Sequence, residues 1–168
     1  LSPYLVVNQY NAVRILFEVR DSGIPREEIF ITSKLWLQDY GYEAAKKGLD
    51  TSLEKLGMDY VDLYLLHQPY GDVAGAWRAL EEAKAAGKVR SIGVSNMTPK
   101  IWKEFVPQFR TLPAVNQVEC NPFFQQRELR ELLAKDPAAG NQALEQMPFD
   151  LLRDKDGLNL RDYQLRAI

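Results

Sequence analysis

The stretch that decides the fold is Asp62-Leu63-Tyr64-Leu65-Leu66-His67-Gln68-Pro69. A short apolar run that is cut by a proline is typical of a buried strand in a parallel sheet. The only histidine of the chain ends this run, so the strand would carry an ionisable side chain to its carboxyl end. In α/β folds, ligands and catalytic groups gather at the carboxyl ends of parallel strands. The stretch therefore predicts both a parallel sheet and the position of a site.

Three further runs have the same form, with apolar residues followed by a polar end. They are Ile29–Lys34, which ends in a lysine, Ser91–Asn96, which ends in a serine-asparagine pair, and Ala114–Glu119, which carries amides and a carboxylate. The carboxyl ends of parallel strands meet at one edge of a sheet. Four such strands predict an active site built from several strand tips.

Helical patterns separate these strands. Apolar residues recur at helical spacing over 45–56, 74–83, 101–105 and about 125–135. Gly57 and Gly87 are natural helix ends, and Thr98-Pro99 is a typical helix start, with an N-cap followed by proline. A further helix from about Asn8 to Arg20 precedes the first strand. The chain is thus predicted to hold about four strand–helix units after one unpaired helix.

Strands that alternate with helices predict an α/β fold with a parallel sheet and right-handed crossovers. A complete (β/α)8 barrel of the TIM type usually needs about 250 residues, and this chain has 168. We therefore expect a partial (β/α)8 barrel, with a short doubly wound sheet as the structural alternative. No glycine-rich phosphate-binding fingerprint follows any of the strands, which argues against a Rossmann-type dinucleotide site.

The periodic pattern ends at about Lys135. Residues 136–146 are rich in Ala, Gly, Asn and Gln, and the apolar runs after them are too short and too charged for another strand–helix unit. We therefore predict a truncated barrel over residues 1–135 and an atypical carboxyl-terminal extension over residues 136–168.

Composition excludes several classes of function. A net charge of −2 gives no support for a nucleic-acid partner. One histidine and one cysteine, Cys120, leave no metal cluster and no internal disulfide, which is compatible with the cytoplasm. Cys120 itself is expected to be a small buried residue rather than a nucleophile. No apolar run approaches the roughly 20 residues of a membrane span, and no secretory signal is expected.

Several blocks in the same order resemble the aldo-keto reductase family, especially its bacterial 2,5-diketo-gluconate reductase-like branch. The blocks are Ser22–Glu28, Phe30–Trp36, Leu53–Pro69, Gly87–Asn96 and Val115–Glu119. The resemblance extends from Ser22 to Gln126, roughly two thirds of the chain. It implies a (β/α)8 barrel that reduces small aldehydes and ketones with NADP(H).

The resemblance also implies roles for individual residues. Family members use a tyrosine as general acid, for which Tyr10 is the candidate and Tyr4 a poorer one. Lys34 resembles the lysine that lowers the pKa of this tyrosine, since a nearby ammonium favours phenolate. His67 resembles the histidine that orients the carbonyl oxygen. Trp36 fits a substrate pocket or a loop contact equally well.

Ser95, Asn96 and Gln117 resemble the residues that hydrogen-bond the nicotinamide carboxamide, and such bonds fix which face of the ring meets the substrate. Ser95-Asn96 could instead cap the following helix, although Thr98-Pro99 already fills that role. Asn116 and Gln117 alternate on one strand, so at most one of them points toward the core.

The sequence also departs from the family pattern. Val6-Val7-Asn8-Gln9-Tyr10-Asn11 stands where the family has Asp-Thr-Ala…Tyr-x-Asn-Glu, so the family's aspartate has no counterpart, and Met97 replaces an aromatic residue. The family's first two strands and its later cofactor-binding blocks have no counterpart either. The alternative to a reductase is therefore an inactive barrel fragment that self-associates through open sheet edges or serves as an interaction module.

The tail has a second resemblance. Residues 158–168, LNLRDYQLRAI, resemble the Leu-Arg-x-Tyr-Gln-x-x-Ala-Ile run that opens helicase motors, including restriction-enzyme translocating subunits. No phosphate-binding Gly-Lys-Thr loop accompanies this run, so the sequence predicts no ATPase activity.

Overall fold

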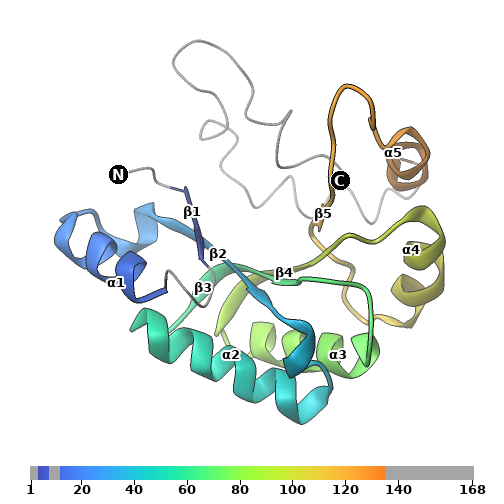
Figure 1. Ribbon diagram of the computed structural model, residues 1–168. Coiled ribbons are helices and arrows are strands. Elements are labelled where there is room, and N and C mark those ends of the chain that lie inside the picture. The colour runs from blue at the N-terminus through green and yellow to red at the C-terminus, as the bar shows by residue number, and fades with distance from the viewer. Residues whose placement is uncertain (1–3, 8–11, 135–168) are drawn as a thin grey trace. The chain divides into compact units, whose positions relative to one another are not determined.

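The computed structural model describes residues 4–7 and 12–134. Strands and helices alternate along this part of the chain (Figure 1). The strands are β1 (Tyr4–Val7), β2 (Phe30–Leu35), β3 (Val61–Leu66), β4 (Val89–Ser95) and β5 (Asn116–Gln117). The helices are α1 (Ala12–Asp21), α2 (Tyr42–Leu56), α3 (Val73–Ala85), α4 (Pro99–Phe105) and α5 (Arg127–Ala134), with short 3-10 turns η1 (Arg26–Glu28), η2 (Leu37–Asp39) and η3 (Val106–Gln108).

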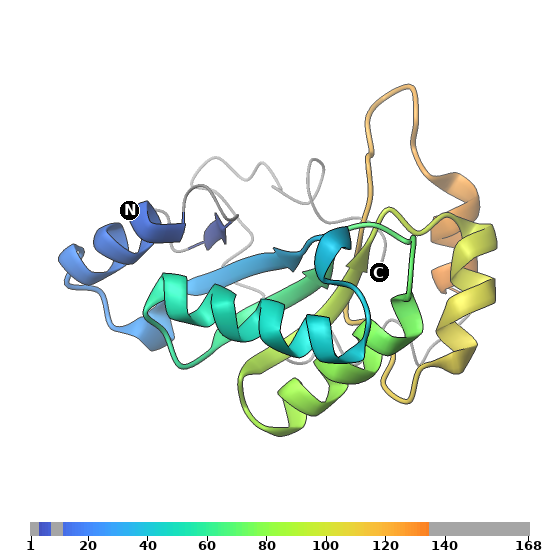
Figure 2. The same cartoon turned by 60° about the horizontal axis from the view of Figure 1, so that its bottom comes forward.

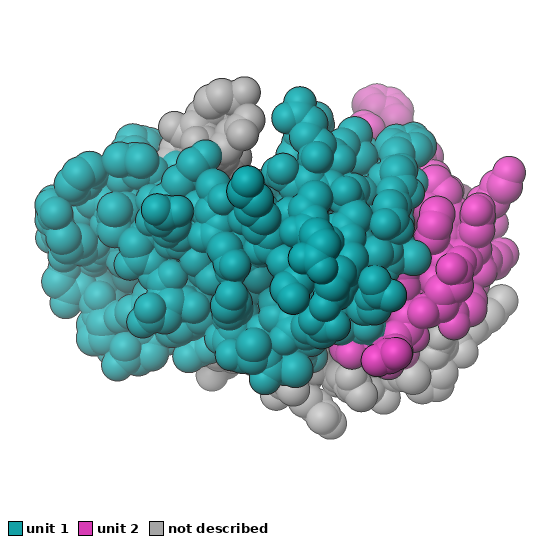
Figure 3. All heavy atoms as spheres, turned by 90° about the horizontal axis from the view of Figure 1, so that it is seen from below, with its two compact units in different colours: residues 1–92 teal, residues 93–168 magenta. Residues whose placement is uncertain are grey.

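The chain divides into two compact units, Leu1–Ile92 and Gly93–Ile168 (Figure 3). Strand β4 begins in the first unit and ends in the second. The strand order is β1-β2-β3-β4-β5, so neighbours in the sheet are also neighbours in the sequence. Strand β1 pairs with β2, β2 with β3 and β4 with β5, and these pairings are parallel. The predicted parallel sheet is confirmed.

In the first unit, helices α2 and α3 lie together on one face of the strands (Figures 1 and 2). The side chains of β2 alternate between half-buried and buried. The buried ones lie on the face that the helices cover. Ile31, Ser33 and Leu35 are buried, whereas Lys34 is half-buried. Tyr64 of β3 shares a 2.8 Å hydrogen bond with Ser52 of α2. The even-numbered residues of β2 therefore lie on the face opposite the helices.

The helix ends follow the local sequence signals. Gly57 ends α2 with a φ of 60°, a left-handed conformation that glycine adopts without steric cost. Thr98 caps α4, since its hydroxyl oxygen accepts a hydrogen bond from the Ile101 amide at 3.4 Å. Both predicted helix boundaries are confirmed.

The amino-terminal part differs from the prediction. Helix α1 is not unpaired, because strand β1 precedes it and pairs with β2 from Tyr4↔Phe30 to Val7↔Ser33. The run that forms β1 is short, and pairing with β2 is what defines it as a strand. In α1, the residues turned to the core are Ala12, Ile15 and Val19, whereas Phe17 is 45% exposed.

Three charged side chains and one tyrosine come together near the amino ends of the strands. We call Arg26, Tyr60, Asp62 and Arg90 the amino-end cluster. The Asp62 carboxylate is 2% exposed and accepts from Arg26 at 2.8 Å, from Arg90 at 3.0 Å and from the Ile31 amide at 2.9 Å. The two guanidinium groups stack on the Tyr60 ring, 4.1 and 4.5 Å from its centroid. Asp62 is thus a paired structural acid.

Candidate active site

The predicted site residues fall into one group in each unit. In the first unit, Lys34 ends β2 and His67 follows β3. The register places Lys34 opposite Leu65, and paired residues of parallel strands share a face. His67 stands two residues beyond Leu65, so it lies on the same face as Lys34. The structure therefore places on one face the lysine predicted to lower the pKa of the catalytic tyrosine and the histidine predicted to orient the carbonyl oxygen.

His67 lies against the loop that follows β2. Its amide donates to the Leu35 carbonyl at 3.1 Å, which extends the strand pairing by one residue. Its ring meets Trp36 edge to face, with centroids 4.7 Å apart and an interplanar angle of 73°. Burial lowers the pKa of His67, and the nearby Lys34 charge lowers it further. The imidazole is therefore neutral at pH 7.

Lys34 is half-buried, and burial lowers its pKa. Within the described residues no carboxylate lies in ion-pair distance of this lysine. The Lys34 charge is therefore free to act on its surroundings, and after burial it is the second cause that lowers the pKa of His67. This is the arrangement by which a cation can favour the ionised form of a nearby phenol.

In the second unit, β4 and β5 hold Ser95, Asn96 and Gln117 together. The Gln117 carbonyl accepts from the Ser95 hydroxyl at 3.0 Å and from the Asn96 amide at 2.9 Å. Asn96 has a φ of 60°, a conformation that asparagine tolerates better than most residues. The turn after β4 therefore presents the Asn96 side chain at the strand end. Ser95-Asn96 does not cap α4, because Thr98 does.

Asn116 and Gln117 have different surroundings. Asn116 is 1% exposed, and its side-chain amide donates to the Met97 carbonyl at 2.8 Å and accepts from the Met97 amide at 3.3 Å. Gln117 is half-buried, and its buried Oε1 has no hydrogen-bond partner among the residues that the structure describes. Buried polar atoms are nearly always paired. This carbonyl oxygen is thus suited to accept a hydrogen bond from a ligand such as a carboxamide.

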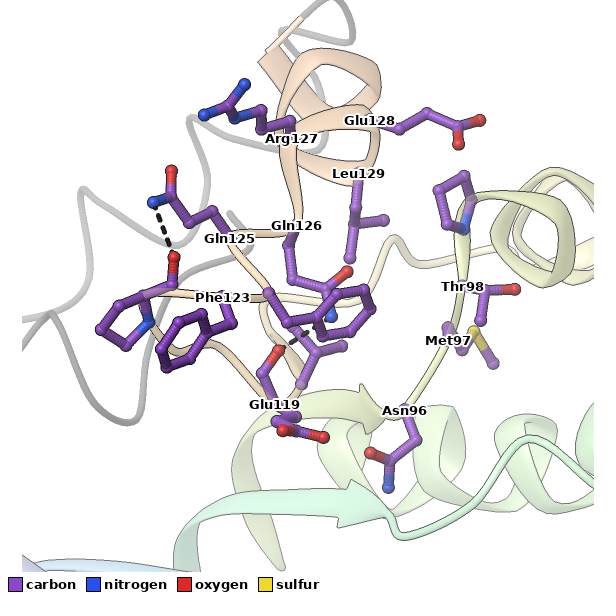
Figure 4. Close-up of a pocket in the computed structure, with 14 residues that line it drawn as sticks. Asn96, Met97, Thr98, Glu119, Phe123, Gln125, Gln126, Arg127, Glu128 and Leu129 are labelled. Atoms are coloured by element: carbon purple, nitrogen blue, oxygen red, sulfur yellow. Dashed lines mark hydrogen bonds between the residues drawn. The ribbon is translucent and has the colours of Figure 1, made fainter.

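A pocket of about 520 Å³ lies entirely within the second unit (Figure 4). Asn96, Met97 and Thr98 line it on one side, and the segment from Val118 to Leu129 lines the other. Two amide side chains fix this segment, because Gln126 donates to the Glu119 carbonyl and Gln125 to the Pro122 carbonyl, at 2.8 and 3.1 Å. Phe123 is fully exposed. Of the predicted cofactor residues, only Asn96 lines this pocket.

Some predictions lie outside the described residues, and some residues were missed. Tyr10, the extension 136–168 and the helicase-like run 158–168 are not described, so the boundary at 135/136 remains a prediction. No sequence pattern singled out Tyr40 or the loop 121–124. The position of this loop after a strand end was the available signal.

The aldo/keto reductase family model matches residues 9–147. The chain belongs to the aldo/keto reductase family. Glyoxal reductase of Bacillus subtilis is 46% identical over 114 residues, which are 67% of this chain and 41% of that protein. The crystal structure of the aldo/keto reductase from Brucella melitensis superposes with a TM-score of 0.76 and 40% identity, covering 79% of this chain and 54% of that one.

A structure of an aldo-keto reductase of Bombyx mori in complex with NADP has a TM-score of 0.72 and 29% identity, with 79% of this chain and 48% of that one covered. The chain spans about two fifths of the length of the curated relatives it matches. The expected fold, part of an aldo-keto reductase (β/α)8 barrel, is confirmed, and β1 adds one strand to the predicted set.

Other kinds of site are not indicated in the described part of the chain. No three side chains of His, Cys, Asp or Glu come together there as a metal site. None of the helices over residues 12–134 is long and apolar enough to cross a membrane.

Proposed function

We propose that this aldo-keto reductase chain takes part in the NADPH-dependent reduction of small aldehydes and ketones. The observation that carries the proposal is the shared face of Lys34 and His67 at the carboxyl ends of β2 and β3, in a chain of this family. Relatives named as glyoxal reductase and morphine 6-dehydrogenase support a carbonyl or alcohol substrate. Neighbouring structures solved with NADP and NADPH support the cofactor.

The first group would act on the carbonyl oxygen. His67, neutral at pH 7 because its pKa is lowered, can donate a hydrogen bond to this oxygen without giving up a proton. Tyr10 is the proposed proton donor. The Lys34 charge would lower the pKa of the Tyr10 phenol toward the working pH, where general acids are most effective. Trp36, in edge contact with His67, would line the substrate pocket.

The second group would hold the nicotinamide carboxamide. The Oε1 of Gln117, which has no partner among the described residues, is the acceptor that a carboxamide N–H needs, and the side chains of Ser95 and Asn96 complete the proposed set. When bound, the cofactor supplies the hydride. The part of these residues is to fix the face of the ring that is presented to the substrate.

The test is a titration of the full chain with NADPH, followed by quenching of tryptophan fluorescence. We expect saturable binding in the micromolar range. The Gln117→Met variant should bind more weakly, whereas Lys34→Met should bind normally and lose about a hundredfold or more in turnover of a carbonyl substrate. Absence of binding up to millimolar NADPH would overturn the proposal.

The alternative is an inactive chain that self-associates. Among the described strands, β1 and β5 are the two edges of the sheet, and unpaired edges are a route to pairing between chains. This alternative predicts dimers in size-exclusion chromatography and no bound nucleotide. The cytoplasm is the proposed compartment in either case, and Cys120, free in the structure, is compatible with it.

A further inference from the structure

We propose that Tyr40 is a positioning residue that locks the backbone after His67 to the loop that carries Trp36. The inference rests on the proposed role of His67 in orienting the carbonyl oxygen. It assigns a task to a residue at the end of η2, which no strand-end pattern singled out.

Tyr40 makes two hydrogen bonds to the same backbone residue. Its hydroxyl donates to the Gln68 carbonyl at 2.7 Å and accepts from the Gln68 amide at 3.0 Å. Gln68 directly follows His67, and the partners are 28 residues apart in the sequence. A single phenol therefore satisfies both backbone polar groups of the residue that follows His67.

The hydroxyl can keep both roles because it stays protonated. Burial raises the pKa of Tyr40 to about 12. A neutral phenol donates and accepts at the same time, whereas a phenylalanine at this position would do neither. The Tyr40 ring also lies against the loop that follows β3. A Cβ added at Gly71 of this loop would stand 3.9 Å from the ring.

The turn η2 connects Tyr40 and its hydrogen bonds to Gln68 with Trp36. Trp36 precedes η2 and Tyr40 follows it, and the Tyr40 amide donates to the Leu37 carbonyl at 3.2 Å. The end of β2 and the loop after it thus hold His67 at three points: Leu35 binds its amide, Trp36 contacts its ring and Tyr40 binds the amide of the next residue. Loss of the two hydrogen bonds between Tyr40 and Gln68 would allow the His67 ring to move away from the edge of Trp36.

The test is NMR of the isotope-labelled full chain without cofactor. His67 is the only histidine, so its imidazole protons give one set of signals, and the Trp36 ring current shifts them. In Tyr40→Phe we expect these signals to move toward their positions in the urea-unfolded chain. The matched control is Tyr64→Phe, which removes another buried phenol, bonded to Ser52, and should leave the His67 signals in place. Unchanged signals in Tyr40→Phe, or an equal change in Tyr64→Phe, would overturn the proposal.

A second measurement needs no variant. The Gln68 amide should be protected from hydrogen exchange in the unmodified chain, and in Tyr40→Phe it should exchange about tenfold faster. Exchange of this amide in the unmodified chain at the rate of an open loop would overturn the proposal even if Tyr40→Phe failed to fold.

Kinetics separate this inference from the proposed function. With a carbonyl substrate, Tyr40→Phe should lower kcat roughly tenfold to a hundredfold while leaving the KM for NADPH unchanged. If the unmodified chain binds no NADPH, the proposed function fails, and the NMR result still decides whether Tyr40 holds His67.

Discussion

The strands of the first unit carry charged side chains at both ends, and the two ends use them differently. At the amino ends, Asp62 is buried between two guanidinium groups and a backbone amide. At the carboxyl ends, Lys34 has no carboxylate partner among the described residues, and its charge adds to burial in lowering the pKa of His67. The first arrangement stabilises the sheet, and the second leaves charge available for a reacting group, as in barrels whose sites lie at the carboxyl ends.

The second unit repeats this contrast within one strand. The side chain of Asn116 is fully engaged with the backbone of Met97, whereas the neighbouring Gln117 keeps a buried oxygen unpaired among the described residues. In this strand the paired amide holds the turn after β4, and the amide with the unpaired oxygen is the one proposed to bind a ligand.

The largest effect on stability should come from the amino-end cluster. We expect Asp62→Asn to lower the free energy of unfolding by about 3 kcal/mol, because two guanidinium groups lose a buried partner. Urea unfolding followed by tryptophan fluorescence measures this change. The control is Asp50→Asn, which removes an exposed ion pair to Lys88 and should cost less than about 0.5 kcal/mol. Equal losses in the two variants would show that the cluster does not stabilise the sheet.

Asn116→Ala should have the next largest effect. It leaves the amide and carbonyl of Met97 without their side-chain partner in a buried turn, so we expect a loss of about 2 kcal/mol in the free energy of unfolding. The same urea experiment measures it. A loss near zero would mean that the turn after β4 is held by other contacts.

Gln117→Met should have the opposite sign. The substitution removes an unsatisfied buried oxygen at nearly constant volume, so the free energy of unfolding should stay unchanged or rise by up to about 1 kcal/mol. Its affinity for NADPH should fall. A destabilisation equal to that of Asn116→Ala would contradict the assignment of Gln117 to the site.

Lys34→Met should have the smallest effect on stability and a clear effect on His67. Burial and the Lys34 charge both lower the pKa of His67, so removal of the charge should raise this pKa, as NMR titration of the single imidazole would show. Lys47→Met, at an exposed position of α2, is the control and should leave the pKa unchanged. If the pKa of His67 does not rise in Lys34→Met, the Lys34 charge does not act on His67.

The same coupling predicts a pH dependence of stability. Because the folded-state pKa of His67 lies below its unfolded value, the unfolded chain binds the proton first as the pH falls through about 6.5. Stability should therefore decrease on acidification through this range, and the decrease should be smaller in Lys34→Met. Urea midpoints at several pH values measure it.

The sequence by itself determined the local structure of this protein. Apolar runs defined β2 to β4 and glycine and threonine set helix ends, because these preferences depend on neighbouring residues. The resemblance to the family also came from local blocks, and the polar ends of the predicted parallel strands identified Lys34, His67 and Asn96 as candidates.

Only the tertiary structure decided which side chains are paired. Asp62 binds Arg26 and Arg90, and Tyr40 binds Gln68, across 28 to 36 residues of sequence. Strand β1 became a strand through its pairing with β2. Such contacts depend on strand register and on how loops pack, and no local pattern encodes them. Alternation along the strand predicted that Asn116 and Gln117 lie on different faces, and the fold decided which of the two amides is paired.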